Sequence, residues 1–140
     1  MSRPGLGFGM RHVALFVRDL AACEQFYVDL LGMEVEWRPD DHNVYLTSGG
    51  DNVALHQAEP GMQRDETTQR LDHIGFFLDS AEAVDHWFAW LHSQQVRIRS
   101  EPRDHRDGAR SFYCYDPDGT LVQMIHHPEV SQWEQLKGLN

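Results

Sequence analysis

The chain contains a long internal repeat. Residues 11–17 read RHVALFV, and residues 72–78, 61 positions later, read DHIGFFL. Both segments predict a strand with histidine as its second residue, and the same offset continues through the helical pattern that follows. A repeat of this length indicates two copies of one supersecondary unit. If the copies pack about a pseudo-two-fold axis, His12 and His73 face one cavity, and two converging imidazoles are the start of a metal site.

The composition and charge of the chain argue against several classes of binding partner. With 22 acidic and 12 basic residues, the formal net charge of the 140-residue chain is -10, which argues against binding to nucleic acid. No apolar run approaches the roughly 20 residues that span a bilayer, so we expect no membrane partner. Residues 1–9 lack the apolar core of a signal peptide, which predicts a cytoplasmic protein. Two cysteines, Cys23 and Cys114, do not make a disulfide scaffold.

Each half of the chain predicts the element order β-α-β-β-β. Asp19 and Ser80 are placed to cap the two helices, and Gly32 is placed to end the first. The domain plan is an N-terminal extension, a first module, a polar linker, a second module and a tail that suits a short helix, over residues 1–9, 10–57, 58–70, 71–128 and 129–140. The strands are expected at residues 11–17, 33–38, 44–47, 53–57, 71–78, 96–100, 111–115 and 120–127.

The last two strands of each module form a hairpin. In the second hairpin, residues 116–119 read DPDG, a strong turn signal with proline second and glycine fourth. Aligning the two hairpins by their turns requires an offset of 68, because the second module has the longer loop. This alignment makes Leu55 and Gln123 symmetry mates.

These motifs together resemble one known family, the vicinal oxygen chelate superfamily. That superfamily includes glyoxalase I, extradiol ring-cleaving dioxygenases, and fosfomycin and bleomycin resistance proteins. The resemblance covers roughly residues 10–128 and implies an α+β fold in which two βαβββ modules form a half-open barrel around one cavity. It is carried by the segments HVALFVRDL, FYVDLLGM, DHIGF and YDPDG, at residues 12–20, 26–33, 72–76 and 115–119.

In metal-binding members of the superfamily, the ligands come from the first and last strand of each module. Carried over by position, the resemblance implies His12, His73 and Gln123 as ligands of a divalent ion (Fe, Mn, Ni, Co or Zn), whereas Leu55 at the fourth position cannot bind. A site of two neutral imidazoles and one amide oxygen has no anionic ligand, so the ion is held weakly or is absent. An anionic substrate with two adjacent oxygens would supply the missing charge.

A different strand register remains open. A shift of one residue turns every side chain to the other face of a strand. It would bring His56 inward in place of Leu55, and His12, His56 and His73 would make a better site for zinc, iron or nickel.

Other residues are candidates for the pocket. Tyr113 or Tyr115 is placed to hydrogen-bond an oxyanion at the metal, and Arg110 to meet an anionic substrate group. His56, Glu59 or a metal-bound hydroxide would serve as a base. Substrate contacts are expected from Leu55, Gln57 and Phe76.

Two functions follow from the sequence. The first is a metal-dependent enzyme of the glyoxalase or dioxygenase type, acting as a lyase, isomerase or ring-cleaving dioxygenase on a small molecule with adjacent oxygens. The alternative is a metal-free binding module of the bleomycin-resistance type, sequestering a drug or sensing a small molecule, which the acidic charge suits for a cationic ligand. The resemblance also implies a homodimer.

Overall fold

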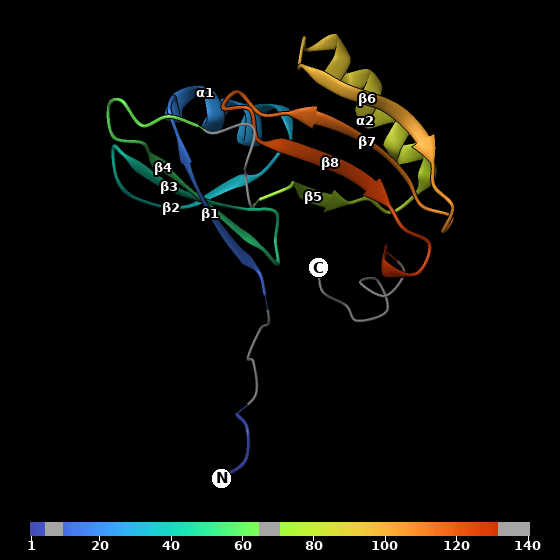
Figure 1. The fold of residues 1–140 in the computed structure, drawn as a ribbon, viewed down its shortest axis with the longest axis horizontal. Helices are drawn as coiled ribbons and strands as arrows, with labels where there is room; N and C mark the ends of the chain where they lie inside the picture. The colour runs from blue at the N-terminus through green and yellow to red at the C-terminus, as the bar shows by residue number, and fades with distance from the viewer. Residues whose placement is uncertain (5–9, 65–70, 132–140) are drawn as a thin grey trace.

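The computed structural model describes residues 1–4, 10–64 and 71–131 (Figure 1). Its described part contains two four-stranded sheets, each formed by one half of the chain, and a helical segment belongs to each half. The elements are β1 (His12–Val17), α1 (Leu20–Glu24), η1 (Gln25–Leu30), β2 (Glu34–Asp40), β3 (Asn43–Thr47), β4 (Asn52–Gln57), β5 (Ile74–Phe77), α2 (Ala81–Ser93), β6 (Ile98–Asp104), β7 (Arg110–Tyr115) and β8 (Leu121–His126).

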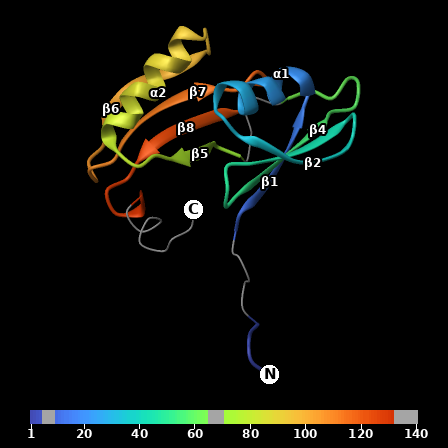
Figure 2. The same cartoon turned by 180° about the vertical axis from the view of Figure 1, so that it is seen from behind.

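The two sheets have the same topology. Their strand orders are β1-β4-β3-β2 and β5-β8-β7-β6, and in each the first strand runs parallel to the last while the other neighbours are antiparallel. The sheets lie side by side, as Figures 1 and 2 show from opposite sides. The α+β fold of two βαβββ modules is therefore confirmed. The main differences from the expected strands are a short β5 and a β6 that extends to Asp104, beyond the expected end at residue 100.

The helices begin where the sequence predicts but the first one changes character. Asp19 Oδ1 accepts a hydrogen bond from Ala22 N at 3.0 Å, and Ser80 Oγ accepts one from Ala83 N at 3.1 Å. The first helix was expected to continue to Gly32 as one α-helix, but after Glu24 it widens into the π-helix η1, and Gly32 then ends it at a φ of 89°. This wide turn is the only such helix in the described ranges.

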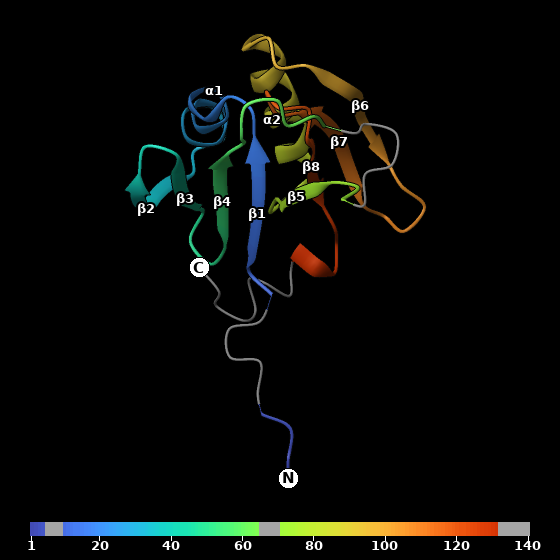
Figure 3. The ribbon, with the colours of Figure 1, turned by 60° about the vertical axis from the view of Figure 1, so that its left-hand side comes forward.

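Each sheet has a core-side face and an open face. In β1, Leu15 and Val17 are buried on the core side, while His12, Ala14 and Phe16 lie on the open side. Figure 3 looks onto β1 and β4, with α1 above the end of the strands. Successive side chains of a strand alternate between its two faces, so the position of a residue in the strand decides whether it faces the core or the open side, where a ligand can bind.

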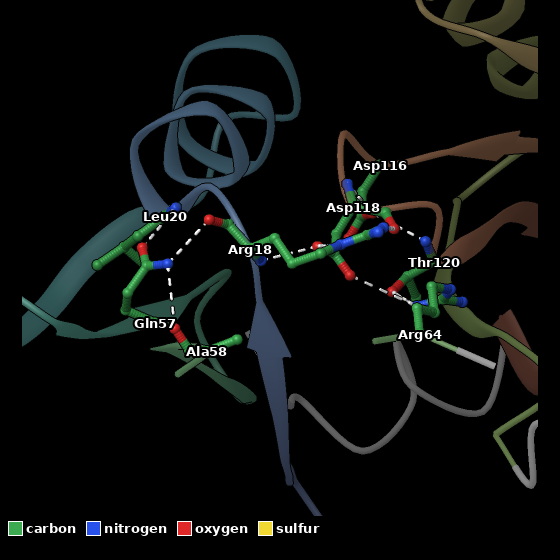
Figure 4. Close-up of polar contacts among 8 residues, drawn as sticks. All are labelled: Arg18, Leu20, Gln57, Ala58, Arg64, Asp116, Asp118 and Thr120. Carbon is green, nitrogen blue, oxygen red and sulfur yellow. Dashed lines mark hydrogen bonds and ion pairs between the residues drawn. The ribbon is translucent and has the colours of Figure 1, made fainter. Parts of the chain in front are cut away.

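The two modules join at the C-terminal end of β1. The buried Tyr27 hydroxyl donates to Asp116 Oδ2 at 2.8 Å, across the module boundary. Arg18 bonds Asp118 through its backbone N at 2.8 Å and its side-chain Nε at 3.1 Å (Figure 4). The DPDG turn is thus both a hairpin turn and a contact between the two modules. Most of the predicted tail helix lies outside the described residues, and no described helix is long and apolar enough to span a membrane.

Candidate metal centre

His12 lies at the start of β1 with one ring nitrogen fixed. Its Nδ1 is 2.7 Å from Asn52 Oδ1, and Asn52 Nδ2 donates to Glu36 Oε1 at 2.8 Å. The carboxylate of Glu36 only accepts, so it orients the Asn52 amide, whose oxygen then requires a hydrogen on His12 Nδ1. Nε2 of His12 consequently has a free lone pair. This is the tautomer that binds a metal through Nε2.

His73 precedes β5, and its Nδ1 is also fixed by a hydrogen bond, in this case directly to a carboxylate without an amide in between. Its Nδ1 lies 2.6 Å from Asp72 Oδ2, so Nδ1 bears the hydrogen and Nε2 again presents its lone pair. The ring packs edge-on against Tyr113, with the ring centroids 5.4 Å apart. In the first module, His12 similarly lies against Tyr45, at 6.4 Å. The internal symmetry therefore extends to the tyrosine beside each histidine.

Gln123 lies on β8, on the same open face as His73. Its Nε2 donates to Ser111 Oγ at 3.1 Å, and within the described residues its Oε1 has no hydrogen-bond partner. Gln123 pairs with Gly75, and a Cβ placed at that glycine would lie 3.8 Å from Oε1. The amide oxygen therefore lies over β5, two residues along from His73, and is available as a ligand.

The hairpin alignment that paired Leu55 with Gln123 is wrong by one residue. Ala14 pairs with Ala54 in the first sheet, and Gly75 pairs with Gln123 in the second, so Ala54 is the symmetry mate of Gln123. The turn between β7 and β8 is one residue longer than the turn between β3 and β4. Leu55 is completely buried on the core side, so the expectation that it contacts substrate is wrong.

His56 lies on the open face, as the alternative register required, but far from His12. It pairs with Phe16, four residues beyond His12 along parallel strands, a separation of roughly 13 Å. No group of three or more histidine, cysteine or acidic side chains in residues 1–4, 10–64 and 71–131 is arranged to hold an ion. The three-histidine site of His12, His56 and His73 is therefore not formed within the chain.

Two cavities open beside these residues. His56, Phe16 and Glu59 line one of about 1000 Å³, where the open face of the first sheet meets residues 57–63. His56 Nδ1 is 2.5 Å from Asn43 Oδ1, which leaves its Nε2 toward the solvent side. In the second module, Gln123 and Tyr113 line a cavity of about 530 Å³.

Four predicted site residues are engaged elsewhere. Arg110 is paired with Asp85 at 2.8 Å and Asp104 at 3.0 Å, so its charge is already neutralised on the core side of the second sheet. Phe76 also points to the core side, where it packs against buried residues, whereas its neighbour Phe77 lies on the open face and is 55% exposed. The expected substrate contacts of Arg110 and Phe76 are therefore wrong.

Gln57 and Tyr115 are the other two predicted site residues whose side chains are engaged elsewhere. The Gln57 amide bonds backbone groups, accepting from Leu20 N at 3.1 Å and donating to Arg18 O at 2.8 Å (Figure 4). It thereby fixes the connection between β1 and α1. The Tyr115 hydroxyl accepts from Arg99 at 2.8 Å, and the Arg97 guanidinium lies 4.2 Å above its ring. Of the two tyrosines, only Tyr113 contacts His73 and pairs with Gln123.

The comparisons with known proteins identify the family of the chain. The profile described as the Glyoxalase/Bleomycin resistance protein/Dioxygenase superfamily matches residues 9–124. The chain belongs to this superfamily. It is 36% identical to metallothiol transferase FosB of Staphylococcus epidermidis (strain ATCC 12228 / FDA PCI 1200), covering 82% of this chain and 79% of that protein. A FosB of Staphylococcus saprophyticus is 32% identical, with 82% and 74% covered.

Solved structures of superfamily members share the fold. A glyoxalase/dioxygenase from Nostoc punctiforme superposes with a TM-score of 0.75 at 24% identity, covering 92% of this chain and 97% of that one. Lactoylglutathione lyase from Agrobacterium tumefaciens gives a TM-score of 0.71 at 22% identity, covering 94% and 98%. At these identities the likeness establishes the fold, and the site must be argued from its own residues.

The sequence alone did not reveal the groups that orient the candidate ligands. Asn52 and Glu36 set the tautomer of His12, Asp72 sets that of His73, and Ser111 orients Gln123. Asp72 stood directly beside its histidine in the repeat and was recognisable. Glu36 was not, because it reaches Asn52 only across the sheet.

Proposed function

We propose that the protein is a metal-dependent enzyme acting on a small molecule with two adjacent oxygens, with His12, His73 and Gln123 as the protein ligands of a divalent ion. The observation that supports this most is the shared state of the two histidines. In each histidine, Nδ1 donates its hydrogen to an oxygen, and the lone pair of Nε2 is left free on an open sheet face. A merely structural histidine has no need of this arrangement in both modules.

The donor set fits a borderline transition metal. Two imidazole nitrogens and one amide oxygen suit Mn²⁺, Fe²⁺, Co²⁺, Ni²⁺ or Zn²⁺. None of the three ligands is anionic, but Asp72 contacts His73 directly and Glu36 reaches His12 through Asn52. Such outer carboxylates orient the imidazoles and add negative charge near the ion. They offset part of the charge that a glutamate ligand would have supplied.

The ion would act as a Lewis acid toward the substrate oxygens that chelate it. Tyr113, which contacts His73, is placed to donate its hydroxyl to an oxygen that develops negative charge. The names of the FosB relatives link a metal to a thiol, so we propose a thiol as the second substrate. The cavity beside His56 and Glu59 has room for the body of this second substrate.

Metal titration of the Gln123→Glu variant tests the ligand assignment. A carboxylate in place of the amide adds an anionic ligand at the same position, so the affinity for Mn²⁺ should rise by about 10-fold or more. Isothermal titration calorimetry on protein freed of metal measures it. Gln95→Glu is the matched control, since Gln95 is exposed beyond the end of α2, and it should give no gain.

Equal Mn²⁺ affinities for wild type and Gln123→Glu would place that side chain outside the coordination sphere. If neither protein binds any of the five ions, the alternative of a metal-free binding module replaces the enzyme. A cationic ligand would then suit the net charge of -10.

We further propose that the enzyme is a homodimer whose copies share their sites. His12 stands at the opposite end of β1 from the junction with the second module, six residues from Arg18 and so roughly 20 Å away. Large aromatic side chains are exposed on the open faces: Phe16 at 62%, Trp37 at 59% and Phe77 at 55%. A second copy that covers these faces would bury them and bring His12 of one copy to His73 and Gln123 of the other.

Mixing two inactive variants tests the shared site. If each site takes His12 from one copy and His73 from the other, unfolding and refolding His12→Ala together with His73→Ala restores one intact site in each mixed dimer. Random pairing then gives about a quarter of the wild-type metal sites. Mn²⁺ bound per chain measures the recovery. No recovery, from a mixture that size-exclusion chromatography shows to be dimeric, would place the whole site within one copy.

A further inference from the structure

We propose that Ser111 and His105 are positioning residues that hold the Gln123 amide with its carbonyl oxygen toward the open face. Gln123 lies on β8 and Ser111 on the adjacent β7, while His105 comes from the loop between β6 and β7. Gln123 Nε2 is 3.1 Å from Ser111 Oγ, and His105 Nε2 is 2.7 Å from the same oxygen. The three side chains form a chain of hydrogen bonds that ends at the candidate ligand.

The tautomer of His105 sets the direction of this chain. A serine hydroxyl has one hydrogen to donate, and the amide nitrogen of glutamine can only donate. With Nε2 of Gln123 donating to Ser111 Oγ and His105 in its Nδ1–H tautomer, the hydroxyl hydrogen goes to His105 Nε2, which accepts it. In the reversed amide, Oε1 of Gln123 would need that same hydrogen, and His105 would lose its donor. An accepting His105 therefore selects the orientation that leaves the carbonyl oxygen free.

Ser111 and His105, which together select the amide orientation, are held in place by burial and by backbone hydrogen bonds. Ser111 is 1% exposed, so water does not compete for its hydroxyl. His105 is clamped by backbone bonds, donating from its N to Ala109 O at 2.7 Å and accepting at its O from Gly108 N at 3.0 Å. Gly108 has a φ of 92°, and a Cβ there would lie 3.3 Å from Pro128. The loop therefore has little freedom to withdraw the imidazole.

Only an amide ligand needs this help. A glutamine side chain has one end that binds a cation and one that repels it, whereas the two oxygens of a glutamate are equivalent. The inference rests on the proposed function in taking Gln123 as a ligand, but the amide orientation itself can be measured without metal.

The first experiment uses metal-free protein labelled with 15N. One Gln123 side-chain proton should be hydrogen-bonded to buried Ser111, and its exchange with solvent should be at least about 10-fold slower than for exposed Gln95. Ser111→Ala and His105→Ala should each remove most of that protection, whereas Ser93→Ala, at the end of α2, should leave it unchanged. Protection unaffected by the first two substitutions would overturn the proposal.

The second experiment measures Mn²⁺ affinity in a double-mutant cycle. His105→Ala should weaken binding by about 10-fold when residue 123 is Gln, the usual loss for an outer-shell contact, and by less than about twofold in the Gln123→Glu background. Equal losses in both backgrounds would show that His105 only supports the loop, and would overturn the proposal. If no variant binds Mn²⁺, the proposed function fails, and the exchange measurement alone decides the amide orientation.

Discussion

Replacing His73 with alanine is expected to abolish divalent metal binding, with the affinity for Mn²⁺ falling by more than about 100-fold. Loss of an outer-shell contact typically costs 10–100-fold, and His73 is a direct ligand in the proposed site. The substitution also removes the group through which Asp72 adds negative charge. Calorimetric titration of the metal-free protein measures the loss, and circular dichroism checks that the variant folds.

His92→Ala is the matched control for this loss. His92 is an exposed imidazole in the last turn of α2, where its ring lies 5.8 Å from Phe88, remote from both open faces. Metal affinity should be unchanged by its removal. Retention of wild-type affinity in His73→Ala, or an equal loss in His92→Ala, would remove His73 from the coordination sphere.

Replacing Asp116 with alanine is expected to destabilise the fold by roughly 3–5 kcal/mol. The Asp116 carboxylate is buried and accepts three hydrogen bonds: from the Tyr27 hydroxyl at 2.8 Å and from the backbone N of Asp118 and Thr120, each at 2.9 Å. A buried donor that loses its acceptor costs about 1–3 kcal/mol. The loss affects the DPDG turn and the module junction together. Urea denaturation measures it.

Asp116→Asn is the control, because its oxygen still serves both backbone amides and its amide group still faces Tyr27.

Burial raises the pKa of Asp116, so the folded protein binds a proton on this carboxyl group more firmly than the unfolded chain does. The stability that the proton contributes is complete below the ordinary carboxyl pKa and is lost as pH rises through the folded-state value. Relative to Asp116→Asn, the wild type should therefore gain stability on acidification. An alanine variant as stable as the asparagine variant would contradict the proposed role.

The two modules contribute unequally to the candidate site. At equivalent positions on the last strands, the second module has Gln123 and the first has Ala54, which has no ligating atom. Duplication thus gives a symmetric pair of histidines and one amide ligand. Such a site leaves more of the ion's coordination open to substrate oxygens than a site with four protein ligands.

The sequence by itself determined the fold and pointed to the two histidines as candidate ligands. The repeat of residues 11–17 at 72–78 and the caps at Asp19 and Ser80 are local patterns, and each reflects side-chain periodicity or backbone hydrogen bonding within a few residues. The DPDG turn is equally local. Such signals survive in a single sequence because the interactions behind them span a short stretch of chain.

Only the tertiary structure decided which side chains share a face. One additional residue in the β7–β8 turn changes the internal alignment by one, and one residue is enough to move Leu55 into the core and Ala54 onto the open face. The orienting contacts of Glu36 and Ser111 depend on cross-strand register in the same way. Register is fixed by burial of one whole sheet face against its helix, and that is a property of the assembled module rather than of any local segment.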